Sequence, residues 1–271
     1  MTTNPITPAP NIIDVKDLTV GYGSNIILQD LNFSVKRGEI FVILGGSGCG
    51  KSSLLKNMIG LYDPPRGSVL IEGEDIVTAE GKERQEILTR FGVMYQQGAL
   101  FGSMNLLENV RLFLEEYTQL SEGEMSLISR CKLDLVGLLP FESFMPSEIS
   151  GGMQKRAAIA RAMALDPDIL FLDEPSAGLD PITSAELDQT ILSISRNLGI
   201  TFVVVTHELP SIYTIADRII MLDKETKGII AEGDPRWLRD HSDNLQVRKF
   251  FNRGASNVLT DNNLHPETKP A

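Results

Sequence analysis

The sequence predicts a mixed α/β fold: a core of buried parallel strands and helices, an antiparallel β subdomain before it, and an inserted α-helical subdomain. Three observations lead to this prediction. Apolar runs at 39–44, 168–175 and 200–208 are typical of buried parallel strands. Residues 12–38 alternate apolar and polar side chains around turn signals, as half-buried antiparallel strands do. Between about 98 and 165, long helical patterns dominate.

The first elements follow from local composition. Residues 1–11 are rich in proline, threonine and asparagine, which predicts a flexible arm. Gly-Tyr-Gly and Lys-Arg-Gly supply turns within 12–38, so antiparallel strands are expected to lead into the buried strand at 39–44. The apolar residues of 51–62 have helical spacing, and 64–76 returns to turn and strand.

The later elements complete one main domain, expected to span 12–235. Residues 181–198 have a helical pattern and separate two of the buried runs, which predicts a β-α-β unit. A closing hairpin is expected at 218–234. The segment 236–271 is expected to lie outside the main domain, as a helix up to residue 251 followed by a polar, disordered tail.

Composition excludes some classes of function. The chain has 271 residues, 42% of them hydrophobic, which is enough for one large core or two smaller ones. Its net charge of −11 gives no electrostatic basis for binding nucleic acid. The short basic stretch 154–161 ("QKRAAIAR") lies in a helical pattern and is expected to be a solvated helix face.

Cysteine content and hydropathy indicate the compartment. Cys49 and Cys131 are too few for a disulfide framework, which favours a reducing, cytosolic environment. Residues 1–11 lack the basic and apolar regions of a signal peptide, so none is expected. No apolar run approaches the roughly 18 residues that cross a bilayer, so any membrane role is expected to be indirect, through a partner.

The stretch "GGSGCGKSS" (45–53) matches the phosphate-binding loop pattern Gly-x4-Gly-Lys-Ser, after a predicted strand and before a predicted helix. Backbone N–H groups can point at phosphate oxygens only where side chains do not crowd them, which explains the glycines. The lysine is expected to reach the β- and γ-phosphates, and the serine hydroxyl is a hard ligand for Mg²⁺. A structural glycine-rich turn is the alternative, and the strand–loop–helix context disfavours it. Nucleotide contacts are expected from Gly45, Gly46, Ser47, Gly48, Cys49, Gly50, Lys51, Ser52 and Ser53.

Cys49 lies inside this loop. The nearby Lys51 and the start of a helix are both expected to lower the pKa of its thiol. Alkylation of Cys49 is therefore expected to block nucleotide binding, and ATP to protect the thiol.

A phosphate loop also needs an acid that organises a metal ion. Asp173 ends a predicted buried strand and Glu174 follows it at once. Neighbouring strand residues point to opposite faces, so the two carboxylates are expected to have different roles. Asp173 is expected to hold Mg²⁺ and Glu174 to polarise the attacking water. A solvated acidic pair before a proline turn is the alternative, which the apolar run disfavours.

Six motifs stand in one order along the chain: the phosphate loop, "YQQ" (95–97), "ISGGMQ" (149–154), "FLDEP" (171–175), "GLD" (178–180) and "VVTHE" (204–208). Across residues 12–235 this order resembles the ATPase subunit of ABC transporters, whose core is a RecA-like P-loop NTPase fold. The resemblance implies an enzyme that uses ATP and Mg²⁺ and hydrolyses ATP to ADP and phosphate.

The resemblance implies roles for single residues on the protein's own side of the site. Tyr22 in "VGYG" is similar to the aromatic residue that stacks on adenine, with an ordinary strand tyrosine as the alternative. Gln96 matches the Q-loop glutamine, which touches Mg²⁺ and the attacking water. Gln97 is the alternative, and the spacing to "GALF" favours Gln96. His207 matches the switch histidine that hydrogen-bonds the γ-phosphate.

Other residues are implied to act on a second copy. Ser150, Gly151 and Gly152 match the signature motif, with Ser150 as the N-cap of a helix whose N–H groups are bare. In the family this helix end faces the γ-phosphate bound by the other protomer. Asp180 matches the aspartate between protomers. The resemblance therefore implies a head-to-tail homodimer closed around two ATP molecules.

Two departures from the common pattern narrow the resemblance. The signature begins with Ile149 and has Met153 at its fifth position, and no proline follows the Q-loop glutamine. These features, with "PITS" (181–184) and "VRKFF" (247–251), resemble the Mla/MCE-type phospholipid-transport ATPases of bacterial envelopes. Lipid transport between the inner and outer membranes, through a separate permease, is what this resemblance implies.

Partners and location follow from the same resemblance. It implies integral membrane permease subunits, an MCE lipid-binding protein, a STAS-domain regulator and no nucleic acid. It also implies a cytoplasmic, peripheral position on the inner membrane, with the permease docking near 98–110 or that segment serving as helical core. The C-terminal helix with Trp237, Leu238, Phe250 and Phe251 is expected to pack on its own domain, with the dimer partner as the alternative.

Other functions remain as alternatives. One is the ATPase subunit of an importer for a polar nutrient such as an amino acid, which Met153 and the "GALFGSMN" stretch disfavour. Another is a soluble ABC ATPase that acts on ribosomes or DNA. The single cassette, the lack of a heptad run and the acidic balance disfavour it. A P-loop kinase would leave the signature helix without a purpose.

Overall fold

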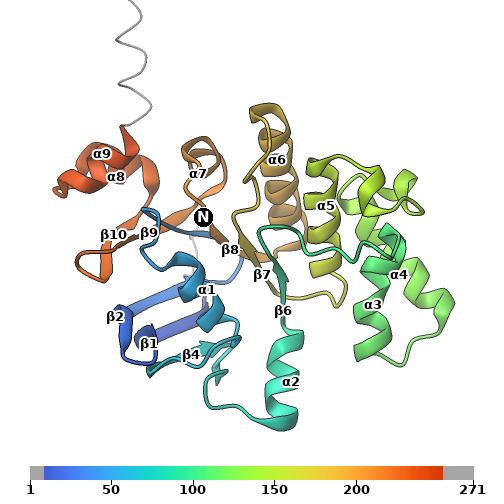
Figure 1. Cartoon of the computed structure of the whole chain (residues 1–271), viewed down its shortest axis with the longest axis horizontal. Coiled ribbons are helices and arrows are strands. Elements are labelled where there is room, and N and C mark those ends of the chain that lie inside the picture. Colours follow the sequence, from blue (N-terminus) through green and yellow to red (C-terminus); the bar gives the residue numbers. More distant parts are fainter. Residues whose placement is uncertain (1–8, 253–271) are drawn as a thin grey trace, which may run out of the picture.

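The centre of the molecule is a six-stranded sheet, seen in the computed structural model, which describes residues 9–252 (Figure 1). Its strand order is β10-β9-β3-β8-β7-β6. The first five strands in chain order run parallel, and β10 is antiparallel to β9 at one edge. The strands are β3 (Ile40–Gly45), β6 (Phe91–Met94), β7 (Ile169–Asp173), β8 (Thr201–Val205), β9 (Arg218–Asp223) and β10 (Gly228–Gly233).

Buried side chains alternate between the two faces of this sheet. On β3, Phe41 and Ile43 join a core with the antiparallel strands, whereas Val42 and Leu44 join a core with the helical subdomain. This double burial explains why the strands are continuous apolar runs in the sequence. The predicted β-α-β unit is confirmed, because α6 (Pro181–Leu198) connects the neighbouring parallel strands β7 and β8.

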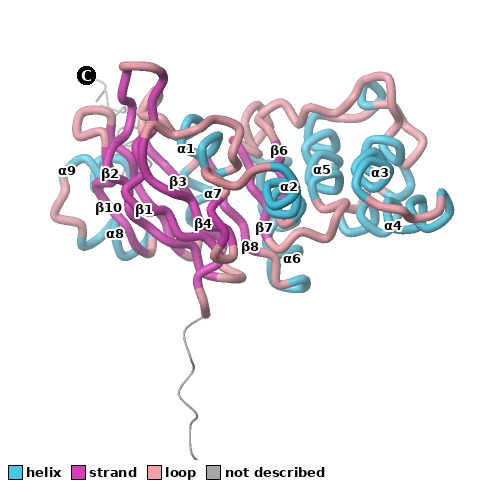
Figure 2. Tube along the Cα trace, turned by 90° about the horizontal axis from the view of Figure 1, so that it is seen from below, coloured by secondary structure: helices cyan, strands magenta, loops and turns pink. Residues whose placement is uncertain are grey.

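The antiparallel sheet lies against one face of the core, beside α1 (Lys51–Met58) (Figure 2). Its order is β2-β1-β4-β5, and the predicted antiparallel pairing of the first two strands is confirmed. Stacked rings of Phe33 and Phe41, 5.6 Å apart, join it to the central sheet. Its strands are β1 (Asn11–Tyr22), β2 (Asn25–Lys36), β4 (Arg66–Ile71) and β5 (Glu74–Asp75).

A group of helices extends from the other side of the molecule (Figures 1 and 2). It consists of α3 (Leu106–Tyr117), α4 (Glu122–Leu135) and α5 (Gly151–Ala162). Capping boxes begin the first two of these helices, at Asn105 with Glu108 and at Ser121 with Glu124. Two short 3₁₀ turns, Leu139–Phe141 and Pro146–Glu148, lead to α5. A further helix that the sequence pattern did not predict, α2 (Gly81–Thr89), precedes β6.

The C-terminal segment corrects one expectation. Instead of one helix, α8 (Pro235–His241) and α9 (Leu245–Phe251) are separated by a turn, in which Asn244 is extended and accepts a hydrogen bond from the Gln246 N–H at 2.8 Å. Leu238 and Phe251 are buried in the core of their own chain. The arm at 1–8 and the tail at 253–271 lie outside the described residues, and residue 11 already belongs to β1.

Within residues 9–252, the search for a helix both long enough and apolar enough to pass through a bilayer found none.

Candidate nucleotide-binding site

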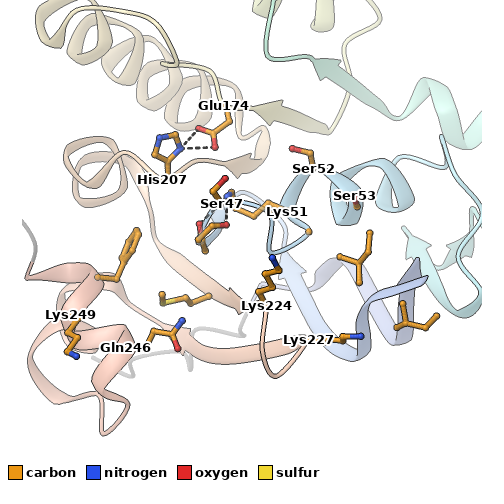
Figure 3. Close-up of a pocket in the computed structure, with 18 of the residues that line it drawn as sticks. Ser47, Lys51, Ser52, Ser53, Glu174, His207, Lys224, Lys227, Gln246 and Lys249 are labelled. Carbon is orange, nitrogen blue, oxygen red and sulfur yellow. Dashed lines mark hydrogen bonds and ion pairs between the residues drawn. The ribbon is translucent and has the colours of Figure 1, made fainter. Parts of the chain in front are cut away.

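The phosphate loop lines a cavity of about 1150 Å³ at the carboxyl ends of the parallel strands (Figure 3). It leaves β3 at Gly45, which pairs with Leu222 of β9. A Cβ atom at Gly45 would lie 2.6 Å from the Leu222 carbonyl oxygen, so only glycine fits there. Gly48 has φ of +72°, and nothing lies within 4 Å of its Cβ position. Close packing thus fixes the base of the loop, while its tip stays open to a ligand.

Lys51 begins α1 and folds back over the loop. Its Nζ donates to the carbonyl oxygens of Gly45 at 3.0 Å and Gly46 at 3.3 Å. Gly50 precedes the helix with φ of 103°, and no side chain caps the helix start. The ammonium and the first N–H groups of α1 therefore face the same space, where phosphate oxygens are favourable.

Cys49 does not behave as expected. Its side chain is 2% exposed and packs in the core beneath the loop, rather than facing the cavity. Burial raises the pKa of the thiol, and the opposing effect of Lys51 is smaller. The expected activation of Cys49 is therefore wrong, because desolvation of the thiolate outweighs the nearby positive charge. Its backbone remains part of the loop.

Ser52 and Asp173 bring two oxygen ligands together. The Ser52 hydroxyl donates to Asp173 Oδ1 at 3.2 Å, joining the start of α1 to the end of β7. Burial raises the pKa of Asp173, and the hydrogen bond from Ser52 acts in the opposite direction. One hydroxyl and one carboxylate fit Mg²⁺, which keeps most of its waters and uses one or two protein oxygens.

Glu174 lies beyond the end of β7 and has a left-handed φ of +47°, so the strand alternation expected for the pair does not extend to it. The two carboxylates have different partners, Ser52 for Asp173 and His207 for Glu174. Both Glu174 carboxylate oxygens lie 2.9 Å from His207 Nδ1 (Figure 3). The carboxylate is buried, whereas the His207 side chain is 56% exposed toward the cavity.

The Q-loop is tied to α5 by two buried cations. Gln96 lines the cavity, and Lys155 donates a hydrogen bond to its carbonyl oxygen. Arg161 donates to the carbonyls of Ala99 at 2.6 Å and Gly98 at 2.9 Å. Lys155 is 8% and Arg161 6% exposed. The expectation of a solvated basic helix face is therefore wrong, because both cations reach inward to bare loop carbonyls.

The burial of these cations has an electrostatic cost. Burial lowers the pKa of Lys155, while the charges of Asp173 and Glu174 raise it. The ammonium group that bonds to the Gln96 carbonyl is therefore also attracted by the two carboxylates at the end of β7.

Tyr22 lies at the end of β1, near but outside the described lining of the cavity. Its ring is 46% exposed and meets Tyr62 edge to face, with centroids 5.5 Å apart. Its hydroxyl is 3.2 Å from Ser53 Oγ. An exposed ring next to the helix that follows the phosphate loop is suited to stack on a base.

The signature residues lie elsewhere. Ser150 caps α5, accepting from the Met153 N–H at 3.3 Å, which confirms its predicted N-cap role. Asp180 likewise caps α6, accepting from Ile182 and Thr183. Among the described residues, the cavity lining includes none of Ser150, Gly151, Gly152 or Asp180. The structure therefore assembles only part of the predicted site within one chain.

The two signature glycines differ in their surroundings. A Cβ at Gly152 would lie 2.2 Å from Thr183 Cγ2, so Gly152 lets α5 pack closely on α6. At Gly151 the nearest atom, Leu179 Cδ2, would be 3.7 Å away. Packing among the described residues therefore does not require glycine at position 151.

Sequence reasoning missed one side of the cavity. Asn25, Ile26 and Ile27 at the start of β2, and Lys224 and Lys227 between β9 and β10, also line it, as does Gln246 of α9. No sequence motif marks these residues. The alignment of β9 with β3 brings the hairpin beside the phosphate loop, and this pairing joins segments far apart in the chain.

The family model described as ABC transporter matches residues 28–177. The chain is 47% identical over 240 residues to the "Probable ribonucleotide transport ATP-binding protein mkl" of Mycobacterium leprae, covering 89% of this chain and 68% of the relative. It is 40% identical over 241 residues to the "Intermembrane phospholipid transport system ATP-binding protein MlaF" of Haemophilus influenzae. That match covers 89% of this chain and 90% of the relative.

Among solved structures, the dimeric post-hydrolysis state of the ATP-binding cassette MJ0796 bound to ADP and Pi has a TM-score of 0.72 and 31% identity. The match covers 82% of this chain and 98% of that one. The chain spans about two thirds of the length of the mycobacterial relatives.

Proposed function

The chain belongs to the ABC transporter family of ATP-binding subunits, and from this membership we propose that it hydrolyses ATP to drive phospholipid transport between bacterial inner and outer membranes. One observation carries the ATPase assignment. The carboxyl ends of β3, β7 and β8 bring a phosphate loop, Glu174 and His207 to one cavity, and Asp173 is hydrogen-bonded to Ser52 of its lining.

The proposed chemistry divides the work among these residues. Lys51 and the bare N–H groups of the loop bind the β- and γ-phosphates. Glu174 accepts the proton of the attacking water as the bond between the γ-phosphorus and the bridging oxygen breaks. His207, held by Glu174 through Nδ1, presents its other ring nitrogen to the γ-phosphate. Gln96 positions the water from the side of the Q-loop. Products are ADP and inorganic phosphate.

Mg²⁺ is proposed to bind at Ser52 and Asp173, whose oxygens have the required chemistry, with Gln96 as a further ligand. When bound, the ion neutralises charge on the phosphate oxygens.

The functional unit is proposed to be a head-to-tail homodimer. Ser150, Gly151 and Asp180 are open to a second copy and absent from the cavity lining of their own chain among residues 9–252. In this arrangement Ser150–Gly152 of each copy meet the γ-phosphate held by the other. ATP closes the pair and hydrolysis opens it, because these contacts exist only in the closed state.

Further partners belong to the same proposal. We place the chain at the cytoplasmic face of the inner membrane, held there by integral membrane permease subunits that dock near residues 98–110. An MCE lipid-binding protein and a STAS-domain regulator complete the complex. Support comes from MlaF, a transport-system protein of which the chain covers about nine tenths.

The cargo has a second candidate. The mycobacterial relatives are named for ribonucleotide transport and share higher identity, 47%, with this chain. Phospholipid is preferred because the match to MlaF spans nearly the whole of that protein, whereas about a third of the mycobacterial relatives' own length lies outside the match.

Purification of the tagged chain with its permease from membranes tests the assignment. Mass spectrometry of bound lipid and transfer of a fluorescent phospholipid from proteoliposomes would both be measured with ATP. ATP-dependent transfer that Glu174→Gln abolishes would support the proposal. ATP-dependent movement of labelled ribonucleotide without phospholipid transfer would establish the second candidate instead. Recovery with a solute-binding-protein-dependent nutrient permease would contradict both.

A further inference from the structure

The nucleotide cavity has a wall that the phosphate loop and the catalytic residues leave unexplained. At about 1150 Å³ the cavity exceeds the range of about 300–1,000 Å³ usual for small-molecule sites. The additional wall consists of the turn between β9 and β10, which contributes Lys224 and Lys227, and of α9, whose polar lining residues are Gln246 and Lys249 (Figure 3). We call this turn, residues 223–228, the lysine turn.

Strand register places the lysine turn beside the phosphate loop. Leu222 is the parallel partner of Gly45, the last residue of β3. β3 ends at Gly45 and β9 at Asp223, so the phosphate loop and the lysine turn leave the same end of the parallel sheet, and Ser47 and Lys224 both line the cavity there. Figure 3 shows the Lys224 side chain extending toward Lys51 and the phosphate loop.

Lys227 is at the other end of the turn, beside the antiparallel sheet. Its carbonyl oxygen accepts a hydrogen bond from the Gln29 N–H of β2 at 2.8 Å. It lines the cavity with Ile26 and Ile27, which follow the β1–β2 turn that Tyr22 begins. The lysine turn thus extends from the phosphate end of the cavity to the side where Tyr22 is suited to hold the base.

The lysine turn is held in a fixed shape. Asp223 accepts hydrogen bonds from the N–H groups of Thr226 at 2.9 Å and Glu225 at 3.1 Å, and from Gln246 Nε2 at 2.7 Å. These bonds hold the pKa of Asp223 below its ordinary value, the bond from Thr226 first among them. The Asp223 carboxylate is therefore occupied within the turn, and α9 fixes it through Gln246.

Within residues 9–252 the two lysines have no acidic partner of their own. Among the described residues, no ion pair within 4 Å includes Lys224 or Lys227. Both side chains are exposed at the cavity. On a chain of net charge −11, which repels polyphosphate anions, these two cations, together with the exposed Lys249 of α9 in the same lining, supply a local attractive field.

We propose that the lysine turn is a third nucleotide-binding element, in which Lys224 contacts the phosphate chain, Lys227 contacts the ribose end, and Gln246 of α9 positions both. The ligand class is a nucleoside polyphosphate. This inference rests on the proposed binding of ATP at the phosphate loop. It also gives α9 a role in the nucleotide affinity of its own chain.

The test measures affinities of the full chain for ATP, ADP, AMP and adenosine by calorimetry. Lys224→Gln is expected to weaken ATP binding about two- to fivefold, with a smaller effect on AMP and none on adenosine. Lys227→Gln should weaken all nucleotides by a similar factor. Lys82→Gln, which removes a lysine from exposed α2, is the matched control and should bind like the wild type. Both losses should shrink at high salt, because exposed charges are screened.

Gln246→Leu tests the positioning role without changing charge. It should reproduce the ATP-selective loss of Lys224→Gln, and adding it to Lys224→Gln should cause no further ATP-selective loss. An additive ATP-selective loss, or an equal loss for adenosine and ATP in Lys224→Gln, would overturn the assignment.

The two proposals fail in distinguishable ways. If wild-type chain binds no nucleotide and Lys51→Ala changes nothing, the proposed function fails. If Lys51→Ala loses ATP while Lys224→Gln and Lys227→Gln bind all four ligands like wild type, only the role of the lysine turn fails.

Discussion

Single residues in this molecule often have a packing role beside a proposed chemical one, and Gly152 is the clearest case. Its missing side chain allows α5 to approach Thr183 of α6, whose hydroxyl is bonded to Asp180 Oδ2 at 2.6 Å and fixed in orientation. At Gly151 next to it, a Cβ would make only an ordinary contact with Leu179 Cδ2 at 3.7 Å. The two glycines of one motif are therefore retained for different physical reasons, and substitution can separate them.

Gly152→Ala should lower the free energy of unfolding by about 1–3 kcal/mol, because the new methyl group overlaps Thr183 Cγ2. Gly151→Ala should change it by less than about 0.5 kcal/mol while reducing ATPase activity. Urea denaturation and phosphate release measure the two effects. Thr183→Ser keeps the bond to Asp180 but removes Cγ2, so it should restore most of the stability lost in Gly152→Ala. No restoration would show that the contact does not cause the loss.

Asp188 makes stability depend on pH. It is 4% exposed on α6, and burial raises its pKa to about 6 against the opposing hydrogen bond from Ser211. The folded chain binds this proton more tightly than the unfolded chain, so the free energy of unfolding falls as pH rises from about 4 to about 6 and stays reduced above that.

Asp188→Asn removes this penalty and should stabilise the chain by about 1–3 kcal/mol at pH 7.5, and by much less at pH 4. Urea titrations at both pH values measure the change. Glu186→Gln, an exposed site on the same helix, is the control and should show little effect at either pH. An equal gain for Asp188→Asn at both pH values would contradict the explanation by protonation.

At the scale of elements, α5 connects two parts of the proposed site, the signature residues at its start and the Q-loop. Ser150 caps its N-terminus. Further along the helix, Lys155 and Arg161 donate hydrogen bonds to carbonyl oxygens of the Q-loop. Gly98 and Ala99 both have positive φ, which turns their carbonyls toward the helix. We expect a change in the Q-loop to be transmitted to the start of α5 through these bonds.

Lys155→Met keeps the length and burial of the side chain but removes its bond to the Gln96 carbonyl. ATP turnover should fall roughly tenfold, since a hydrogen bond to a charged group is lost, while ATP affinity stays near wild type. Amide hydrogen exchange should rise in residues 95–99. Arg156→Met is the control, because Arg156 bonds to Val136 outside the Q-loop. Unchanged turnover in Lys155→Met would rule out the link.

The elements also show where sequence reasoning succeeds. The phosphate loop, β7 and β8 are predictable because glycine spacing and apolar runs are local signals. The buried state of Lys155 is not, since its partner is a carbonyl 59 residues away in sequence. Glu174 is predicted from its motif and its place after a buried strand, whereas its positive φ and its contact with His207 are encoded by no local pattern. The lysine turn was missed because strand pairing, a non-local property, brings it to the cavity.

At the scale of the molecule, one chain supplies only part of a proposed reaction centre, and the start of α5 from a second copy is proposed to supply the rest. The cavity holds Lys51, Glu174 and His207, while the start of α5 lies outside the cavity lining in residues 9–252. The dimeric neighbour bound to ADP and Pi has the same fold at a TM-score of 0.72. Two copies are therefore the smallest unit proposed to complete the reaction.

Glu174→Gln should separate assembly from turnover. The amide keeps the size of the side chain and cannot take a proton from water, so hydrolysis should fall by about 10²–10⁴-fold. ATP should then hold the chains together, and light scattering after size-exclusion chromatography should give a dimer mass with ATP and a monomer mass with ADP. Normal hydrolysis in this variant would show that another group acts as the base.

The placement of Ser150 away from its own phosphate loop has a genetic consequence. When a cell carries one normal and one altered gene, mixed pairs form, and each mixed pair has one centre built partly from the faulty chain. Alleles that damage the start of α5 should therefore be dominant, because the phosphate loop of a normal chain is then paired with a defective α5 from its partner. Alleles that merely prevent folding should be recessive, because an unfolded chain recruits no normal chain into a defective pair.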